Sequence, residues 1–149
     1  MNRNPIIPII CALLILLWAY AALSKLAEFS LFTVQLGKQP LPGWSLPILR
    51  WGLPLGELII AFLLASPKYQ YPGLVASTLL MAIFTGYVML ALSGSFGHIP
   101  CSCAGIISKL HWKGHLIFNI ICLIISILGT ILKKRDSNLT YNRQQTLRV

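Results

Sequence analysis

Four long apolar runs dominate the sequence and decide what the chain can fold into. They cover about residues 6–27, 46–65, 71–92 and 113–132, and each is close to the ~20 residues that a membrane-spanning helix needs. None shows the regular alternation of polar and apolar residues that is typical of β-barrel strands. The sequence therefore predicts an all-α integral membrane protein, a four-helix bundle.

The charges narrow the class of protein further. Charged residues make up 10% of the chain and hydrophobic residues 56%, whereas soluble domains carry about 25% charged residues. This excludes a soluble globular enzyme, and it excludes a disordered chain, because disorder needs many charges and few apolar residues. The formal net charge is +9, but the cations flank the apolar runs or gather in the last residues. We therefore expect a lipid bilayer around the chain and no nucleic-acid partner.

The basic tail also sets the expected orientation. Lys and Arg are enriched in the cytoplasmic segments that flank membrane spans, so residues 133–149 are predicted to form a cytoplasmic tail behind a membrane domain of residues 1–132. The expected location is the inner membrane of a bacterium. Four spans then place the N-terminus in the cytoplasm too, and the loop after the third run in the periplasm. The alternative is a signal peptide cleaved near the Ala-Tyr-Ala sequence at 19–21, which would leave three spans and turn the tail outward.

The loop between the third and fourth runs carries the strongest chemical signal. Cys101 and Cys103 are separated by one residue and lie between Pro100 and Gly105. A compartment outside the cytoplasm permits disulfides, and so small a ring closes only with strain, which is typical of labile, catalytic disulfides. We therefore predict a catalytic dithiol that cycles between its reduced and oxidised states. The alternatives are a static disulfide or two plain thiols.

Several neighbours could support the reactivity of this pair. His98, Lys109 and His111 carry ammonium or imidazole groups, which stabilise a nearby thiolate. Pro100 directly precedes Cys101 and is expected to leave that thiol the more exposed of the two.

A zinc or copper site is a second interpretation of the same loop. Cys101 and Cys103 could supply thiolates, and His111 and His115, four residues apart, could supply imidazoles from one helix face. However, the Cys-x-Cys spacing is tighter than the usual spacing in zinc sites. We therefore expect no metal and interpret the histidines as interfacial side chains near the lipid headgroups.

Two further cysteines lie inside apolar runs, Cys11 in the first and Cys122 in the fourth. Free buried cysteine usually packs as a small apolar side chain. Neither is therefore given a redox role.

Glu57 is an ionisable residue inside the second run. Such a group is costly within a membrane and by default marks a functional site whose partner should be identified. The candidate partners are Lys25, near the end of the first run, and Arg50, two turns earlier in the second. Lys25 reaches Glu57 easily if the second helix begins at Pro54, and proline is favoured in the first turn of a helix. We therefore expect a break at Gly52-x-Pro54, a shallow Glu57 and an intramembrane ion pair with Lys25, whose role is structural or functional.

Small residues one helical turn apart indicate close packing between membrane helices. Three such pairs occur: Gly73 and Ser77, Ala82 and Gly86, and Ser126 and Thr130. Because small residues are common in any membrane helix, at least one pair is expected to have no packing role.

Three segments, in this order, resemble motifs of the MauE/DoxX family of redox-associated membrane proteins. The sequence ALSKL at 22–26 resembles a small-x-x-Lys-Leu pattern, and PLGE at 54–57 resembles a Pro-x-x-Glu opening of the second span. The sequence PCSCAG at 100–105 resembles the Cys-x-Cys loop of the MauE branch. The likeness covers about residues 6–132, and it departs from the family where alanine replaces the common glycine at 22.

The resemblance implies a DoxX-like four-helix membrane protein that works beside a periplasmic thioredoxin-fold protein and is associated by family with methylamine utilisation. The predicted function is electron exchange with that partner through the Cys-x-Cys pair, with a lipid quinone as the plausible second redox partner. One alternative is a non-catalytic anchor or assembly subunit of a larger membrane complex. The other is copper or zinc handling by the Cys/His loop.

Overall fold

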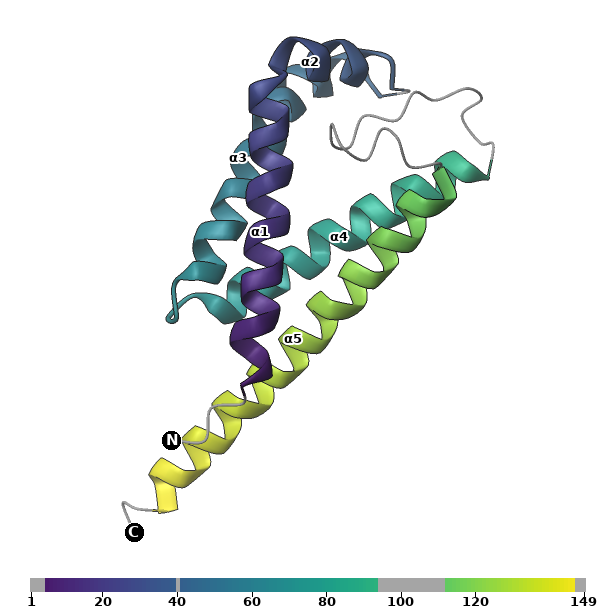
Figure 1. The fold of residues 1–149 in the computed structure, drawn as a ribbon. Coiled ribbons are helices and arrows are strands. Elements are labelled where there is room, and N and C mark those ends of the chain that lie inside the picture. Colours follow the sequence, from purple (N-terminus) through teal and green to yellow (C-terminus); the bar gives the residue numbers. More distant parts are fainter. Residues whose placement is uncertain (1–4, 40, 94–111, 147–149) are drawn as a thin grey trace.

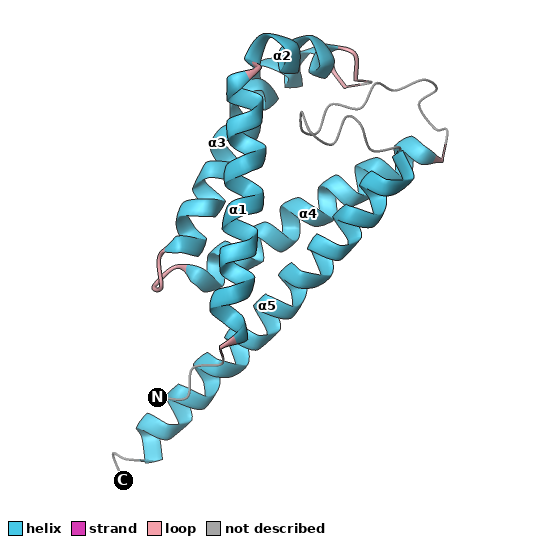
Figure 2. Ribbon diagram, viewed as in Figure 1, coloured by secondary structure: helices cyan, strands magenta, loops and turns pink. Residues whose placement is uncertain are grey.

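The chain folds into helices. The computed structural model describes residues 5–39, 41–93 and 112–146, and within them every regular element is helical (Figure 2). The elements are α1 (Ile6–Ala27), α2 (Phe29–Gly37), the 3-10 turn η1 (Gly43–Ser45), α3 (Leu46–Ala65), α4 (Gln70–Leu92) and α5 (Trp112–Thr146).

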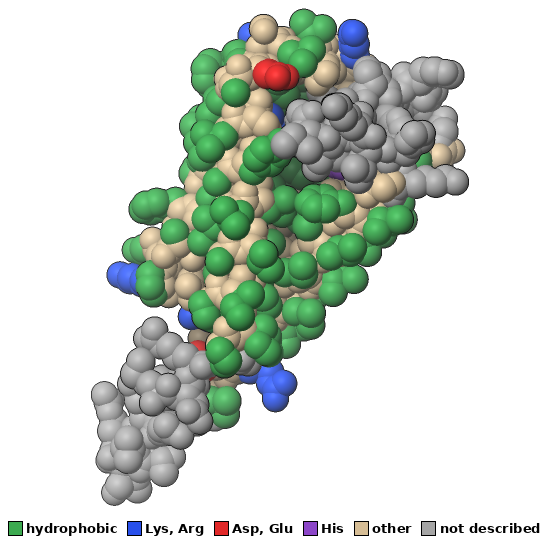
Figure 3. All heavy atoms as spheres, in the orientation of Figure 1, with side chains coloured by type: hydrophobic (Ala, Val, Ile, Leu, Met, Phe, Trp, Pro, Cys, Tyr) green, Lys and Arg blue, Asp and Glu red, His purple; other side chains and the backbone are tan. Residues whose placement is uncertain are grey.

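Four of these helices, α1, α3, α4 and α5, are long and apolar enough to cross a membrane. Apolar side chains cover the sides of the bundle, and the Lys and Arg side chains visible on this face lie toward its two ends (Figure 3). This is the distribution expected where the middle of the surface contacts lipid and the ends contact water. The prediction of an all-α membrane protein with four spans is confirmed.

The long helices form two pairs (Figure 1). α1 packs along α3 and α4 packs along α5, while contacts of α3 with α4 and of α1 with α5 join the pairs. α2 lies across the end of the bundle where α1 finishes, which we call the α2 end (Figure 1). α4 finishes and α5 begins toward this end, whereas α1 begins and α5 finishes at the opposite one.

A hydrogen-bonded cluster ties three helices together in the core. The indole Nε1–H of Trp18 on α1 donates to Ser77 Oγ on α4 at 2.9 Å, and Ser77 Oγ shares a hydrogen bond with Ser126 Oγ on α5 at 3.1 Å. All three side chains are buried. Association of helices in lipid depends on such hydrogen bonds and on close packing, because lipid tails are as apolar as the side chains they replace. We call Trp18, Ser77 and Ser126 the Ser77 cluster.

Glycine allows the closest approach between helices. A Cβ at Gly129 of α5 would lie 2.8 Å from Ile10 Cγ2 and 2.9 Å from Leu74 Cδ2, and one at Gly73 of α4 would lie 3.0 Å from Leu63 Cβ. These distances are shorter than a carbon–carbon contact. The packing of α5 on α1 and α4, and of α4 on α3, therefore depends on the absence of a side chain.

Within the described residues, two of the three small-residue pairs contribute to contacts between helices, and the third, Ala82 and Gly86, does not. Ser77 and Ser126 lie in the Ser77 cluster, and Thr130 Oγ1 on α5 is 3.3 Å from Thr78 Oγ1 on α4. In contrast, Ala82 is exposed, and a Cβ at Gly86 would meet nothing within 4 Å. The pair on the outer face of α4 thus has no packing role in the described part of the chain.

α2 is a helix that the sequence analysis did not predict. Its buried residues are Phe32 and Leu36, whereas Leu31 and Val34 are about half exposed. One apolar side faces the bundle and another faces outward, which is typical of a helix lying at a membrane interface.

The predicted break at Gly52-x-Pro54 is wrong. α3 runs from Leu46 to Ala65 with Pro47 in its first turn and Pro54 in its interior. Pro54 has no N–H and cannot bond to the carbonyl one turn earlier, but membrane helices tolerate this loss because neighbouring groups and small local adjustments compensate. Pro47, rather than Pro54, is the proline that marks the helix start.

α5 is much longer than a single span requires. Its 35 residues correspond to about 52 Å, against a hydrocarbon core of about 30 Å, and its last turns extend beyond the other helices (Figure 1). The basic segment from Lys133 continues this helix. Lys133 Nζ donates to Gln70 Oε1 at 2.9 Å, which ties α5 to the start of α4.

Candidate functional site

A buried ion pair joins α1 to α3. Lys25 Nζ lies 2.8 Å from Glu57 Oε1 and 3.1 Å from Glu57 Oε2. The side chain of Lys25 is 6% exposed and that of Glu57 is 0% exposed. The structure thus brings together the two residues that the sequence predicts to pair, although without the predicted helix break at Pro54.

Lys25 reaches Glu57 because α3 extends past the end of α1. Lys25 lies close to the last residue of α1, whereas Glu57 lies about three turns into α3. The first turns of α3 continue beyond the pair and pack against α2, where the rings of Trp51 and Phe29 are 4.7 Å apart. A helix break at Pro54 is therefore not needed for contact.

Arg50, the other candidate partner of Glu57, has a different neighbour. Its guanidinium carbon lies 6.0 Å from the centroid of the Phe29 ring at the start of α2. A cation over an aromatic face is a favourable arrangement. Arg50 therefore faces α2, and Lys25 is the residue that neutralises Glu57.

The ammonium group of Lys25 has an acceptor for each of its three N–H bonds. Two go to the carboxylate oxygens of Glu57, and the third goes to the backbone oxygen of Ala21 at 3.1 Å. A lysine can donate no more than three hydrogen bonds. Since the pair has no unused donor, its geometry supports a structural role, as a clamp between α1 and α3.

His115 on α5 presents the opposite situation. Its side chain is 3% exposed, and neither ring nitrogen has a hydrogen-bond partner in the part of the chain that the structure describes. His115 is thus buried in the bundle rather than exposed at its surface, and it lies at the start of the candidate span. A neutral imidazole has one donor and one acceptor, and buried polar atoms without partners are rare enough to need an explanation.

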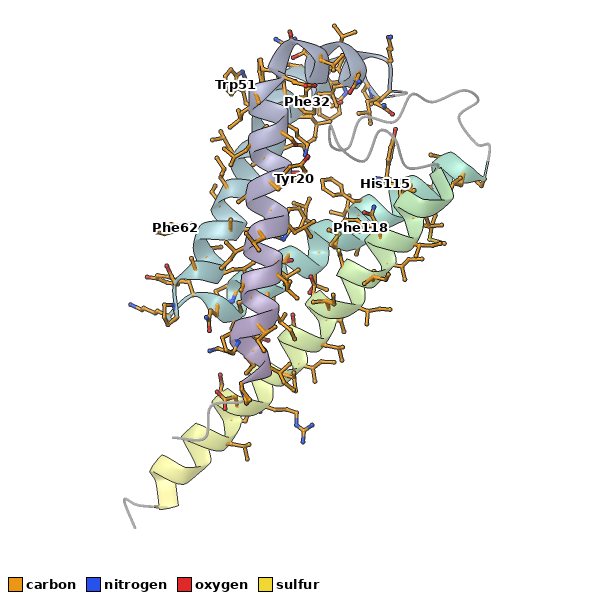
Figure 4. All side chains as sticks on the ribbon, viewed as in Figure 1. Tyr20, Phe32, Trp51, Phe62, His115 and Phe118 are labelled. Carbon is orange, nitrogen blue, oxygen red and sulfur yellow. The ribbon has the colours of Figure 1, made fainter. Side chains whose placement is uncertain are left out.

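The position of His115 follows from the polar face of α5. His115, Asn119, Cys122 and Ser126 are all buried, and their spacing of four, three and four residues places them on one side of the helix. Figure 4 shows His115 and Phe118 on the side of α5 that faces α1. The sequence contained this signal, because the same spacing distinguishes an inward face from a lipid face. We call His115 and Asn119 the His115 face.

A hydrogen bond connects the two helix pairs near the α2 end. The hydroxyl of Tyr87, on α4, donates to Gln39 Oε1, just after α2. Tyr87 lies close to the C-terminal end of α4, which finishes at Leu92. The bond thus joins the α1–α2–α3 side to the α4–α5 side near that end of α4.

The predicted loop site lies outside the described residues. This applies to Cys101 and Cys103, to the supporting residues His98, Pro100, Lys109 and His111, and so to most of the metal alternative. In the described ranges, no group of three or more His, Cys, Asp or Glu side chains is placed to hold a metal ion.

The other two cysteines are free and buried. Cys11 on α1 and Cys122 on α5 belong to the same apolar core as Leu14, Leu74 and Met81. This agrees with their interpretation as small apolar side chains.

Four apolar helices with a buried ion pair and a polar face turned inward define a multi-pass helical membrane protein. The family model described as methylamine utilisation protein MauE matches residues 3–132, most of the chain. The chain therefore belongs to the MauE family. No curated protein matches it, and no solved structure matches it either.

Proposed function

We propose that this MauE-family protein exchanges electrons through Cys101 and Cys103 with a periplasmic thioredoxin-fold protein, in the methylamine utilisation that the family description names. The observation that carries the proposal is the burial of the other two cysteines. Cys11 and Cys122 are free and lie in the core, so Cys101 and Cys103 are the pair left for exchange with another protein.

The reaction is a thiol–disulfide exchange in two steps. The thiolate of Cys101 attacks one sulfur of a disulfide in the partner and displaces the other as a thiolate, which gives a mixed disulfide. The thiolate of Cys103 then attacks Cys101, so the partner leaves as a dithiol and the pair becomes a disulfide. The partner gains two electrons and the pair loses two. The reverse sequence carries electrons the other way.

The fold supports a position for this chemistry at a membrane face. The segment 94–111 joins α4 to α5, and both helices are apolar enough to span the bilayer. The cations that begin at Lys133 lie at the opposite end of α5. Because such cations favour the cytoplasm, the cysteine pair is expected to face the periplasm.

Trapping the mixed disulfide tests the function. The variants Cys101→Ser and Cys103→Ser each keep one thiol, and the one that retains the attacking cysteine cannot resolve the intermediate. It should accumulate a reductant-sensitive adduct with a thioredoxin-fold protein, whereas the other should not. The matched controls Cys11→Ala and Cys122→Ala should behave as the wild type. Full function without an adduct in both loop variants would favour the anchor or assembly role.

Labelling of intact cells tests the orientation. After reduction, a membrane-impermeant maleimide should modify Cys101 and Cys103 in a chain that carries Cys11→Ala and Cys122→Ala. Modification only after lysis would place the pair in the cytoplasm and overturn this part of the proposal.

A further inference from the structure

We propose that the His115 face binds the headgroup of a lipid quinone. This inference rests on the proposed function in the direction in which the partner's dithiol reduces the Cys101–Cys103 disulfide, because the quinone then accepts the two electrons of the dithiol that forms. It is carried by the buried imidazole of His115, whose two ring nitrogens have no partner within the described residues.

The imidazole of His115 has a hydrogen-bond donor and an acceptor that the described residues do not use. His115 and Asn119 are 3% and 4% exposed, and their spacing of four residues places the two side chains one above the other. An imidazole and a carboxamide can each donate and accept. Further along the same helix face, by contrast, Ser126 has its partner in Ser77. The ring nitrogens without a partner thus lie at the α2 end of the buried face of α5.

The location selects a ligand that arrives through lipid. His115 and Asn119 lie within the candidate span of α5, Gly114–Leu139. Figure 4 places His115 on the side of α5 that faces α1. His115 is at the start of this span, so a ligand that reaches the face from the bilayer is soluble in the membrane and carries a polar headgroup at the depth of the membrane interface.

An aromatic ring next to His115 fits a flat headgroup. Phe118 follows His115 by one turn of α5, and both side chains lie on the side of the helix that faces α1 (Figure 4). Phe118 is partly buried at the edge of the apolar core. Planar rings pack favourably against such side chains, edge to face or offset.

The oxidised and reduced forms of a quinone need opposite hydrogen-bonding partners, and side chains that both donate and accept can bind either form. A quinone carbonyl accepts a hydrogen bond from an imidazole or amide N–H, and the hydroxyl of the quinol donates to an imidazole nitrogen or amide oxygen. Oxidation of the dithiol to a disulfide releases two electrons and two protons, and a quinone takes up both to become a quinol. The dithiol thus becomes a disulfide and the quinone becomes a quinol, and no other oxidant is needed.

Thermal unfolding of the purified full chain in detergent tests the binding. The probe is a benzoquinone with a short alkyl chain, and the control ligand carries the same chain on a cyclohexane ring. The quinone should raise the Tm of the wild type, since a ligand stabilises the state that it binds. The cyclohexane compound should not. Equal shifts from both compounds would show partition into the apolar surface and overturn the proposal.

Variants locate the site. His115→Leu should weaken quinone binding about tenfold, the effect of losing one hydrogen bond in a buried site, and His115→Gln, which keeps a donor and an acceptor, should recover part of the affinity. Cys122→Ala changes the same helix face two turns away and should leave the affinity unchanged. An unchanged affinity in His115→Leu would remove His115 from the site and overturn the inference.

The cysteines separate this inference from the proposed function. A chain with Cys101→Ser and Cys103→Ser should still bind the quinone but should no longer reduce it. Quinone binding without any trapped partner would support the site and contradict the thiol exchange. A trapped partner without quinone binding would support the exchange and contradict the site.

Discussion

Ser126, the member of the Ser77 cluster on α5, lies on the same side of that helix as His115 and about three turns away, yet the buried polar atoms of the two sites differ in their hydrogen bonding. In the Ser77 cluster, Trp18, Ser77 and Ser126 satisfy one another across three helices. At the His115 face, the imidazole is as deeply buried but has no partner among the described residues. The first arrangement holds helices together, whereas the second leaves the two ring nitrogens of His115 without a partner among the described residues.

The Lys25–Glu57 clamp belongs with the Ser77 cluster in this comparison. Each N–H of Lys25 has an acceptor, so removing either residue leaves its partner buried without compensation. Removing His115 leaves no protein group behind. Stability should therefore respond strongly to changes in the satisfied sites and weakly to changes at His115.

Loss of the clamp should have the largest effect. Glu57→Gln should lower the free energy of unfolding by about 3–5 kcal/mol, because the ammonium of Lys25 is left buried without its counter-charge. Adding Lys25→Met should recover part of that loss, since the uncompensated charge is then gone. Unfolding in mixed micelles measures both variants.

The control for this experiment makes the same chemical change outside the bundle. Glu28 is exposed just after α1, and Glu28→Gln should leave the free energy of unfolding unchanged. Strictly additive losses for Glu57→Gln and Lys25→Met would show that the two residues are not coupled and would contradict the clamp.

Overfilling the close contact of α5 should have the next largest effect. Gly129→Ala places a Cβ within 3 Å of the Ile10 and Leu74 side chains and should destabilise the protein by about 1–3 kcal/mol. Gly86→Ala makes the same change where nothing lies within 4 Å. It should be neutral or stabilising by up to about 1 kcal/mol, because alanine favours the helix. Equal effects in the two variants would argue against close packing at Gly129.

The Ser77 cluster should give a smaller, measurable coupling. In a double-mutant cycle with Ser77→Ala and Ser126→Ala, we expect a coupling energy of about 0.6 kcal/mol, the average for hydrogen bonds between membrane helices. The matched cycle pairs Ser77→Ala with Thr85→Ala, whose hydroxyl bonds to the backbone of Met81 on its own helix. That cycle should give no coupling, and a similar value in both would remove the hydrogen bond as the cause.

The sequence predicted the four spans because hydropathy integrates over some twenty residues and does not depend on any one of them. It paired Lys25 with Glu57 because a charge in lipid needs a counter-charge. It placed the start of α3 wrongly because two prolines, Pro47 and Pro54, both fit the first turn of a helix, and helix context decides between them. It missed α2 because nine residues with both a buried and an exposed apolar side carry no simple period.

The candidate site was harder to predict than the fold. The Cys-x-Cys motif stands out in the sequence, but His115 did not, because its burial depends on which way α5 faces in the bundle. That rotation is set by Gly129 and Ser126, whose contacts lie three and more turns further along the helix. A histidine near a helix end is ambiguous until those distant contacts fix the rotation.

The smallest expected effect on stability is at His115, and it sharpens the comparison most. In the absence of quinone, His115→Leu should leave the free energy of unfolding unchanged or raise it, because leucine fills a similar volume without an unsatisfied polar atom. The matched variant Asn119→Leu changes the neighbouring buried residue on the same face and shows whether any leucine there is tolerated. Unfolding in mixed micelles, with lipid quinones extracted beforehand, gives both values. A loss of about 2 kcal/mol or more in His115→Leu would mean that the imidazole already has a partner within the protein, and the His115 face would then belong with the clamp and the Ser77 cluster.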